Sequence, residues 1–396
     1  EENMSQGMVA VLDIGSSSVR IVVGKRGING TFNILGTGES EYSGYVDGEF
    51  LDTNELATAI NLAKANAETN SGLEIRDLFV GVPGEFSLCE TKLVSQNYPK
   101  KIRISKENVQ DLFLKASGSE FETTHTMINC SGIYFVLSDN RRVVDPVGER
   151  SSRLSASISC IWADNTFIEI INGILSSLGI QNCEYLSSPL AEGMYLLDEN
   201  QREKYAIIID CGYISTSVSL IRGKGLVMLN SFSLGGGHIS ADLQQCLHIP
   251  FASAEQLKSK VVLSISPSQN DVYEVQIQSK TVPVSMQMTN AVVCARIDMI
   301  ASAINKCLNL CKEEHPEFVD VYLTGGGISY IRGAKDQLSK SIGRNVKLLM
   351  PKDAQMSKAY LSSTLGLLDM ALDKQADEST SFSQKVKGFL AKIFQR

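Results

Sequence analysis

Two short stretches place an aspartate, a glycine and small hydroxyl residues directly after an apolar run. Residues 10–18 read AVLDIGSSS and residues 206–217 read AIIIDCGYISTS, and a second apolar run follows each of them. Glycine lets a turn pass close to a ligand, and successive backbone N–H groups can bind phosphate oxygens. Carboxylates hold Mg²⁺ mostly through water. The repeat therefore predicts two facing hairpins that clamp a nucleotide's phosphates, with Asp13 and Asp210 holding Mg²⁺.

A third glycine motif, LTGGG at residues 323–327, lies between a predicted strand and a predicted helix. Its glycines would let the backbone lie against a flat base or a sugar. The chain has no GxxxxGK[ST] motif, and no GxGxxG follows its first strand, so neither a P-loop nor a dinucleotide fold is predicted. Each motif alone would be an ordinary turn. Their order along the chain is what favours a nucleotide site.

The elements that position these motifs come from hydrophobic patterning. Residues 8–40 predict a three-stranded meander, and residues 52–72 predict a helix that ends at a glycine. The pattern changes between about residues 86 and 163, which predicts an inserted module of a few strands and one helix. Because the hairpin is repeated near residue 205, we expect two similar halves.

Composition narrows the class of protein. A length of 396 residues suggests two or more domains, and a net charge of -7 gives no bulk reason to bind nucleic acid. The nine cysteines form no CxxC pair, the four histidines have no ligand spacing, and no signal peptide is seen at the start. We therefore expect a reducing, cytoplasmic compartment and no structural zinc. No apolar run is long enough to cross a bilayer, so any membrane contact should be peripheral.

The last fifteen residues, FSQKVKGFLAKIFQR, predict a basic amphipathic helix. Such a helix suits an anionic membrane surface, and the alternative is a last helix packed on its own domain. The charged, aperiodic residues 371–381 before it predict a flexible linker, which favours the membrane. The predicted membrane-binding residues are Phe382, Lys385, Val386, Phe389, Leu390, Lys392, Ile393, Phe394 and Arg396.

Together these motifs resemble the actin-like ATPase superfamily (actin, Hsp70 and sugar kinases) and, within it, the FtsA family of bacterial cell-division proteins. The inserted module and the DPVG turn indicate FtsA, because actin and MreB carry their extra subdomain elsewhere. The resemblance covers essentially the whole chain. It implies an α/β, actin-like two-lobe fold with duplicated mixed-sheet ATPase cores, an FtsA-type inserted subdomain 1C and a C-terminal amphipathic helix. It is carried by LDIGSSSVRIVVG, DPVGERSSRLSASISCIWAD, IIIDCGYISTSVSLI, SLGGGHISADL, AEQLK, ARIDMI and VYLTGGGISYIRG.

The resemblance implies ATP and Mg²⁺ as ligands and assigns roles to individual residues. Those expected near the phosphates and the metal are Asp13, Gly15, Ser16, Ser17, Ser18, Asp210, Gly212, Ser215, Thr216, Gly235, Gly236 and Gly237. Those expected near the ribose, the base or the adenosine are Lys258, Arg296, Asp298, Gly325, Gly326 and Gly327.

The second loop departs from the family's Asp-x-Gly-Gly-Gly-Thr pattern, because Tyr213 and Ile214 stand where glycines are usual. Side chains there should restrict the approach of the backbone and disfavour positive φ. No residue stands out as a general base, since His238 is also explained as a surface or hinge residue. We therefore expect ATP binding with weak or absent hydrolysis, and we assign no catalytic residue.

The implied subdomains alternate along the chain. They are 1A (8–83, 164–202 and 346–370), 1C (84–163), 2A (203–245 and 301–345), 2B (246–300), the linker (371–381) and the membrane-targeting helix (382–396).

The implied role is a polymerising adaptor on the cytoplasmic face of the cell membrane at the division site. Its expected partners are the FtsZ C-terminal peptide, bound around residues 240–300, other copies of itself, anionic lipid and downstream divisome membrane proteins, with no nucleic acid. The alternatives are a PilM-like pilus-assembly adaptor and a small-molecule kinase of the same superfamily. A kinase would need an aspartate base beside a closed substrate pocket, and it has no use for a basic amphipathic tail.

Overall fold

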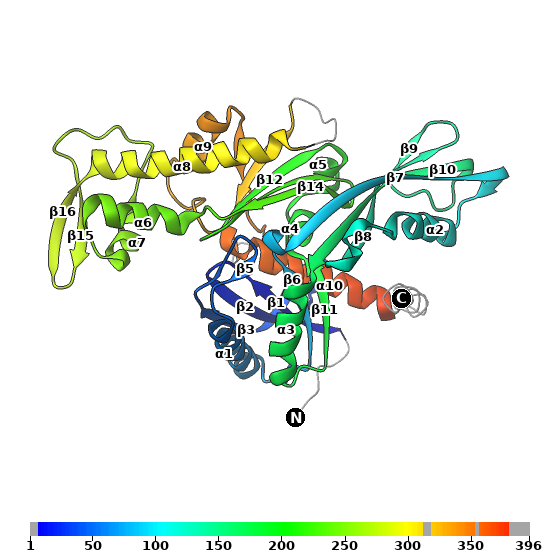
Figure 1. Cartoon of the computed structure of the whole chain (residues 1–396), viewed down its shortest axis with the longest axis horizontal. Helices are drawn as coiled ribbons and strands as arrows, with labels where there is room; N and C mark the ends of the chain where they lie inside the picture. The colour runs from blue at the N-terminus through cyan, green and yellow to red at the C-terminus, as the bar shows by residue number, and fades with distance from the viewer. Residues whose placement is uncertain (1–6, 312–317, 353–355, 380–396) are drawn as a thin grey trace.

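The computed structural model describes residues 7–311, 318–352 and 356–379. The chain forms two lobes and a projecting module (Figure 1). The first lobe is built on a five-stranded sheet in the order β11-β6-β1-β2-β3. Strands β1 and β2 form the first Asp-x-Gly hairpin, and β6 and β11 run parallel to β1. The strands are β1 (Met8–Ile14), β2 (Ser18–Arg26), β3 (Phe32–Glu41), β6 (Asp77–Val82) and β11 (Asn182–Ser187).

Side-chain alternation lets this sheet bury both faces. Leu12 and Ile14 pack with α1 and α3 on one face, and Val9 and Val11 pack with α4 and α10 on the other. The helices are α1 (Thr53–Ser71), α3 (Asn165–Ser177), α4 (Ser188–Leu196) and α10 (Ser362–Ser379). The short elements of this lobe are η1 (Ile28–Gly30), β4 (Tyr45–Val46), β5 (Glu49–Phe50), η2 (Gly84–Phe86) and η4 (Ala359–Leu361).

The second lobe repeats this plan with a sheet in the order β14-β13-β12-β17-β18. The second Asp-x-Gly hairpin joins β12 to β13, and β17 lies parallel to β12. Its strands are β12 (Ala206–Cys211), β13 (Thr216–Arg222), β14 (Gly225–Phe232), β17 (Asp320–Thr324) and β18 (Val346–Leu348).

Helices and a hairpin complete the second lobe, and most of them extend it to the left in Figure 1. They are α5 (Glu199–Glu203), α6 (Gly236–Leu247), α7 (Phe251–Lys260), β15 (Val272–Ile277), β16 (Lys280–Ser285), α8 (Met286–Asn309) and α9 (Ala334–Ile342). The apolar faces of α6, α7, α8 and α9, the hairpin and the sheet share one core that includes Ile209, Leu243, Val293 and Leu338.

The projecting module is a separate sheet in the order β7-β10-β8-β9, with α2 packed against it. It joins the second lobe through an alternating stack of rings and guanidinium groups. The centre of the Tyr134 ring lies 4.7 Å from Cζ of Arg142 and 4.9 Å from Cζ of Arg222. Cζ of Arg222 also lies 4.7 Å from the centre of the Tyr205 ring. The elements are β7 (Ser87–Arg103), α2 (Lys106–Ser117), η3 (Glu120–Thr123), β8 (His125–Leu137), β9 (Arg142–Val143) and β10 (Arg150–Asp164).

These observations confirm the predicted fold class of two α/β lobes with duplicated hairpins and an insert. The predicted start of the linker needs correction. Helix α10 continues to Ser379, and Ala371 and Leu372 are buried against the first sheet, so this part of 371–381 is a packed helix. The predicted membrane-binding residues of 382–396 lie outside the described residues. In the part that the structure describes, no helix combines the length and the apolarity needed to span a membrane.

Candidate functional site

A cavity of about 730 Å³ lies where the two Asp-x-Gly hairpins face each other. Both hairpin loops, the LTGGG turn and the segment before α10 line it. Of the predicted site residues, those that line the cavity are Asp13, Gly15, Ser16, Ser17, Ser18, Asp210, Gly212, Ser215, Gly325 and Gly326. The structure thus brings together residues from opposite halves of the chain.

Three carboxylates line this cavity near the two loops, Asp13, Glu192 and Asp210. The hydroxyls of Ser363 and Thr364, at the start of α10, donate to Asp13 at 3.0 and 2.5 Å. Burial, followed by the charge of Asp13, raises the pKa of Asp210 to about 7. Burial and then the charges of Asp210 and Asp13 also raise the pKa of Glu192 well above its usual range. Such a group of acids is unfavourable unless protons or a cation neutralise it.

The first loop is compact, and its small serine and glycine residues line the cavity. Its turn is closed by the Gly15 amide, which donates to the Ser18 carbonyl at 2.9 Å. The Tyr42 hydroxyl supports the turn by donating to the Gly15 carbonyl at 2.8 Å. The Ser16 hydroxyl accepts from the backbone amides of Ile214 and Ser215 at 3.0 and 3.4 Å. The two lobes are therefore hydrogen-bonded to each other at this point.

The second loop has the same turn without its expected glycines. The Gly212 amide donates to the Ser215 carbonyl at 2.8 Å. Neither Tyr213 nor Ile214 is among the non-glycine residues with positive φ in the described chain. This agrees with the expectation that side chains at these positions disfavour positive φ, and the turn is closed without positive φ at either position.

The ring of Tyr213 extends from this loop toward α6 and α7. Its hydroxyl donates to Glu255 at 3.0 Å, and the ammonium of Lys258 lies 5.2 Å from the ring. Lys258 is buried and donates to Glu255 and to the Gly236 carbonyl, both at 2.9 Å. Burial lowers the pKa of Lys258, although Glu255 opposes this effect. Tyr213 therefore stands between the cavity and the Glu255–Lys258 pair.

The glycines of both triplets allow backbones to pack closely. A Cβ on Gly325, which has φ +85°, would lie 2.2 Å from Asp210 Oδ1. A Cβ on Gly236 would lie 2.3 Å from the Gly327 carbonyl oxygen, and one on Gly237 would lie 2.7 Å from the Tyr213 ring. Gly235–Gly237 and Gly327 thus pack α6 against the second loop and the LTGGG turn, and they do not line the cavity.

Several predicted site residues lie away from the cavity lining, and each has another partner. Thr216 is buried, and its hydroxyl donates to the Leu234 carbonyl at 2.6 Å. Arg296 forms an ion pair with Asp242 at 2.6 Å, and Asp298 accepts hydrogen bonds from Gln337 and Ser341 on α9. The structure therefore does not place Arg296 and Asp298 at the cavity where they were expected, because α8 carries them on a different surface.

Sequence reasoning missed several residues that line the cavity, of which Glu192 is the most important. Glu192 is 3% exposed, and its Oε1 has no hydrogen-bond partner among the described residues. It lies within the run SPLAEGMYLL, where a single acid among apolar residues of a helix was an available signal. The other missed lining residues that bear charge or an aromatic ring are Arg20, Glu39, Tyr45, Glu85, Tyr330, Lys358 and Tyr360.

The acids do not form a closed metal cage. In the described ranges, no group of three His, Cys, Asp or Glu side chains is close enough to hold a metal directly. Mg²⁺ usually keeps several waters and takes one or two carboxylates plus phosphate oxygens. The arrangement of Asp13 and Asp210 fits an ion held largely through water and a phosphate ligand.

Comparison with solved structures shows which fold the chain has. A PilM–PilN type IV pilus biogenesis complex matches with a TM-score of 0.62, 14% identity and coverage of 93% of this chain and 99% of that one. MreB5 of Spiroplasma citri bound to ADP matches with a TM-score of 0.55 and 11% identity, covering 95% of this chain and 99% of that one. The MamK double helical filament matches with a TM-score of 0.50 and 15% identity, covering 92% of this chain and 98% of that one. The chain therefore has the two-lobe fold of the actin-like ATPases.

Sequence comparison then identifies the particular relatives. The family model described as "Cell division protein FtsA" matches residues 207–366. The cell division protein FtsA of Streptococcus pneumoniae serotype 2 is 24% identical over 92% of this chain and 80% of its own length. FtsA of Enterococcus hirae is 25% identical over 92% of this chain and 83% of its own length. The predicted resemblance to the FtsA family is confirmed, and it extends over most of the chain.

Proposed function

We propose that this chain binds ATP with Mg²⁺, polymerises on the inner face of the cytoplasmic membrane at the division site and anchors the FtsZ ring there. The observation that carries the proposal is a sequence likeness to FtsA that extends along both lobes and the insert. The cavity between the two Asp-x-Gly loops supports the nucleotide part of it. MreB5 of Spiroplasma citri, which shares the fold, has been crystallised with ADP bound, and this likeness supports the same part.

The residues of the cavity fit a nucleotide with its metal. A volume of about 730 Å³ is within the range of small-molecule and cofactor sites. Asp13 and Asp210 would hold the metal, which would neutralise both the acids and the phosphates. The hydroxyls of Ser16, Ser17 and Ser18 and the amides of the first loop would bind phosphate oxygens, and Gly325 and Gly326 would lie against the adenosine.

Hydrolysis should be weak, so that the nucleotide serves mainly to favour one conformation of the lobes. The amides of Ile214 and Ser215 already have an acceptor in Ser16, and Tyr213 is held by Glu255. The third acid near the loops, Glu192, would not hold the metal. Because burial raises the pKa of Glu192, it is a poor base at neutral pH until a cation enters the cavity.

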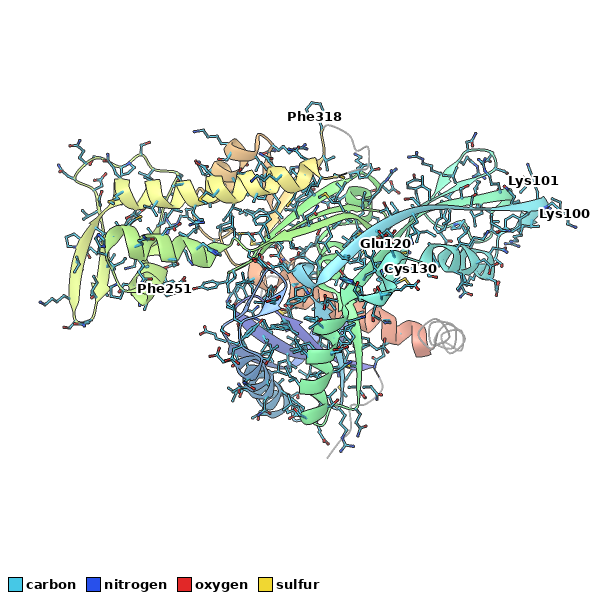
Figure 2. The ribbon with its side chains drawn as sticks, viewed as in Figure 1. Lys100, Lys101, Glu120, Cys130, Phe251 and Phe318 are labelled. Carbon is cyan, nitrogen blue, oxygen red and sulfur yellow. The ribbon has the colours of Figure 1, made fainter. Side chains whose placement is uncertain are left out.

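The FtsZ C-terminal peptide would dock on the second lobe around residues 240–300. This region carries several exposed apolar side chains, which suits an apolar segment of a peptide. They are Phe251, Ile265, Val272, Met288 and Met299. Figure 2 shows Phe251 at the side of α7 that faces the first lobe. The basic amphipathic sequence 382–396 would bind anionic lipid, and downstream divisome proteins would bind the insert.

The proposal is tested on lipid monolayers by negative-stain electron microscopy. The purified chain is compared with a version that ends at Ser379, each with and without ATP and Mg²⁺. We expect filaments that need nucleotide and that reach lipid only when residues 382–396 are present. Fluorescence anisotropy with an FtsZ C-terminal peptide then tests the partner. Monomers that ignore lipid, nucleotide and the peptide would contradict the proposal.

The PilM-like alternative is favoured by one observation, the likeness in fold to the PilM–PilN complex. That likeness has only 14% identity and therefore reports the fold alone, whereas the sequence relatives are FtsA proteins. The truncated chain separates the two functions. A pilus adaptor would keep its recruitment to membranes through a partner protein when residues 382–396 are removed.

A further inference from the structure

The outer end of the inserted sheet presents a group of basic side chains, which we call the basic tip: Lys100, Lys101, Arg103 and Arg150. All four are exposed, and none has an ion-pair partner within the described part of the chain. Lys100 and Lys101 lie at the extremity of the insert, on the right in Figure 2. The tip is therefore the part of this module that lies farthest from the two lobes, and no ion pair compensates its positive charge in the described part of the chain.

The backbone of the basic tip concentrates like charges. Arg103 of β7 lies directly opposite Arg150 of β10, and like charges at such positions repel. The register between the strands then shifts, so that residues 98–101 have no partner on β10. The two lysines are carried on this unpaired stretch. An anionic partner would relieve the repulsion, so the tip suits a docking surface of opposite charge.

The first lobe carries the complementary surface, which we call the acidic edge: Glu41, Asp47, Glu49, Asp52 and Glu55. Residues 41–55 contain five acids and no lysine or arginine. All five acids are exposed, and none of them forms an ion pair in the described ranges. Leu51, which is 58% exposed, lies among them. An apolar side chain beside unpaired charge is a combination found at protein interfaces.

The acidic edge is rigidly built and is not a loose loop. Asp52 caps α1 by accepting from the Asn54 and Glu55 amides at 2.8 and 3.1 Å. Glu55 accepts from the Ser43 amide at 3.0 Å, and β4 pairs with β5. A fixed array of charges loses little conformational entropy when a partner binds.

The two surfaces lie on opposite sides of the molecule. In Figure 1 the acidic edge lies near β5 and α1, on the first lobe, whereas the basic tip lies at the far end of β7 and β10. They therefore cannot pair within one chain. A contact between two different surfaces of identical copies is heterologous, and it builds an open chain of subunits when the rotation does not close.

We propose that the basic tip of one copy docks on the acidic edge of the next, which gives a head-to-tail contact. The inference rests on the proposed function, because it names surfaces for the self-association that the proposal requires. A second copy is favoured over a membrane because one chain supplies both surfaces, and anionic lipid would repel the acidic edge. The net charge of -7 makes most approaches of two copies repulsive, so this pair of surfaces also selects the orientation.

Two charge-reversed variants of the full chain test the contact. The tip variant is Lys100→Glu with Lys101→Glu, and the edge variant is Glu41→Lys with Glu49→Lys. Assembly is measured by sedimentation with ATP and Mg²⁺, in solution and on phosphatidylglycerol vesicles, while flotation reports lipid binding separately. We expect each variant alone to need a protein concentration about tenfold higher to assemble. Lys25→Glu with Lys224→Glu is the matched control, because both lysines are exposed elsewhere, and it should assemble normally.

Mixing the variants gives the decisive result. In an equimolar mixture, the unchanged tip of the edge variant meets the unchanged edge of the tip variant, and the two reversed surfaces also complement each other. We therefore expect the mixture to assemble as an alternating polymer, and a chain with all four substitutions to assemble alone. Circular dichroism verifies that each variant is folded.

The possible failures are distinguishable. If the unaltered chain does not assemble under any of these conditions, the proposed function itself fails. If the unaltered chain assembles and both variants assemble equally well, only the head-to-tail contact is overturned. If the tip variant loses flotation with vesicles but assembles normally in solution, the tip binds lipid, and this inference is again overturned.

Discussion

The two Asp-x-Gly loops have nearly the same backbone and very different surroundings. The Gly15 amide donates to the Ser18 carbonyl at 2.9 Å, and the Gly212 amide donates to the Ser215 carbonyl at 2.8 Å. The first loop fills its turn with serines that line the cavity. The second loop carries Tyr213 toward Glu255, and its Ile214 lies near Gly44 of the first lobe. Duplication has kept the turn while the side chains have diverged.

This difference indicates what each loop contributes to ligand binding and to the arrangement of the lobes. A side chain on the second loop reduces the room for a ligand, and it also connects the loop to α7 and to the first lobe. The first loop and Asp13 should therefore contribute most to ligand binding. The second loop should contribute more to holding the lobes in one arrangement.

The largest expected effect is the pH dependence of stability without ligand. Asp210 has a folded-state pKa of about 7, above the unfolded value of about 4. The folded state thus binds more protons between these values, so Asp210 should lower the free energy of unfolding by up to about 4 kcal/mol as pH rises from about 4 to 7. Glu192, whose pKa is raised in the same direction, should add to this decrease. Urea denaturation at pH 5 and pH 8 measures this.

Asp210→Asn is the control for that experiment. It removes one titrating group while keeping its shape, so the pH dependence over this window should become smaller and leave the part that Glu192 causes. A variant with the unaltered pH dependence would show that other groups cause it.

The next effect concerns the first loop. Asp13→Asn removes a buried negative charge that would hold the metal, and it weakens the hydrogen bonds from Ser363 and Thr364. We expect the affinity for ATP with Mg²⁺ to fall at least tenfold, or about 1.4 kcal/mol or more. Calorimetry measures the affinity, and thermal unfolding verifies that the variant is folded. Unchanged affinity would remove Asp13 from the site.

Tyr213→Gly sharpens the comparison by giving the second loop the glycine that is usual at this position in the Asp-x-Gly-Gly-Gly-Thr pattern. The substitution frees the loop from Glu255 and opens the cavity toward Lys258, so we expect phosphate release to increase several-fold. Stability should fall at the same time, by about 1 kcal/mol for the lost hydrogen bond plus the cost of a flexible residue.

Tyr213→Phe keeps the ring and removes only the hydroxyl, so it is the matched variant for Tyr213→Gly. It should lose about 1 kcal/mol of stability without faster phosphate release. Equal rates in the unaltered chain and in Tyr213→Gly would mean that the tyrosine does not limit turnover.

The smallest expected effect is at the contact between the loops. Ser16→Ala removes the acceptor for the amides of Ile214 and Ser215. We expect a loss of about 1 kcal/mol in the free energy of unfolding without ligand. The loss should shrink when ATP and Mg²⁺ are present, because phosphate oxygens would then supply acceptors. A loss that is the same with and without ligand would speak against phosphate binding at these amides.

Much of the fold was predictable because it depends on local patterns. The two strand–turn–strand repeats, the helix that ends at Gly72 and the LTGGG turn each carry signals in neighbouring residues. The linker was mispredicted for a related reason. Residues 371–379 look polar by composition, yet they continue a helix whose Ala371 and Leu372 contact the first sheet.

The site was less predictable because its remaining parts depend on packing between distant segments. Glu192 reaches the cavity only because α4 lies under the first sheet, and Arg296 is drawn to Asp242 across two helices. Resemblance placed Arg296 and Asp298 by their position in a motif, whereas the pairings of α8 with α6 and α9 decide where these side chains lie. The position of the Tyr213 ring likewise depends on its hydrogen bond to Glu255 of α7.

Isothermal titration calorimetry of the unaltered chain with ATP tests the central claim most directly, once with Mg²⁺ and once with a chelator in its place. We predict saturable binding of one nucleotide per chain that weakens strongly without Mg²⁺, because the acids of the cavity then repel the phosphates. No binding in either condition, or equal binding with and without the metal, would contradict the assignment of the cavity between the two loops as the site for ATP and Mg²⁺.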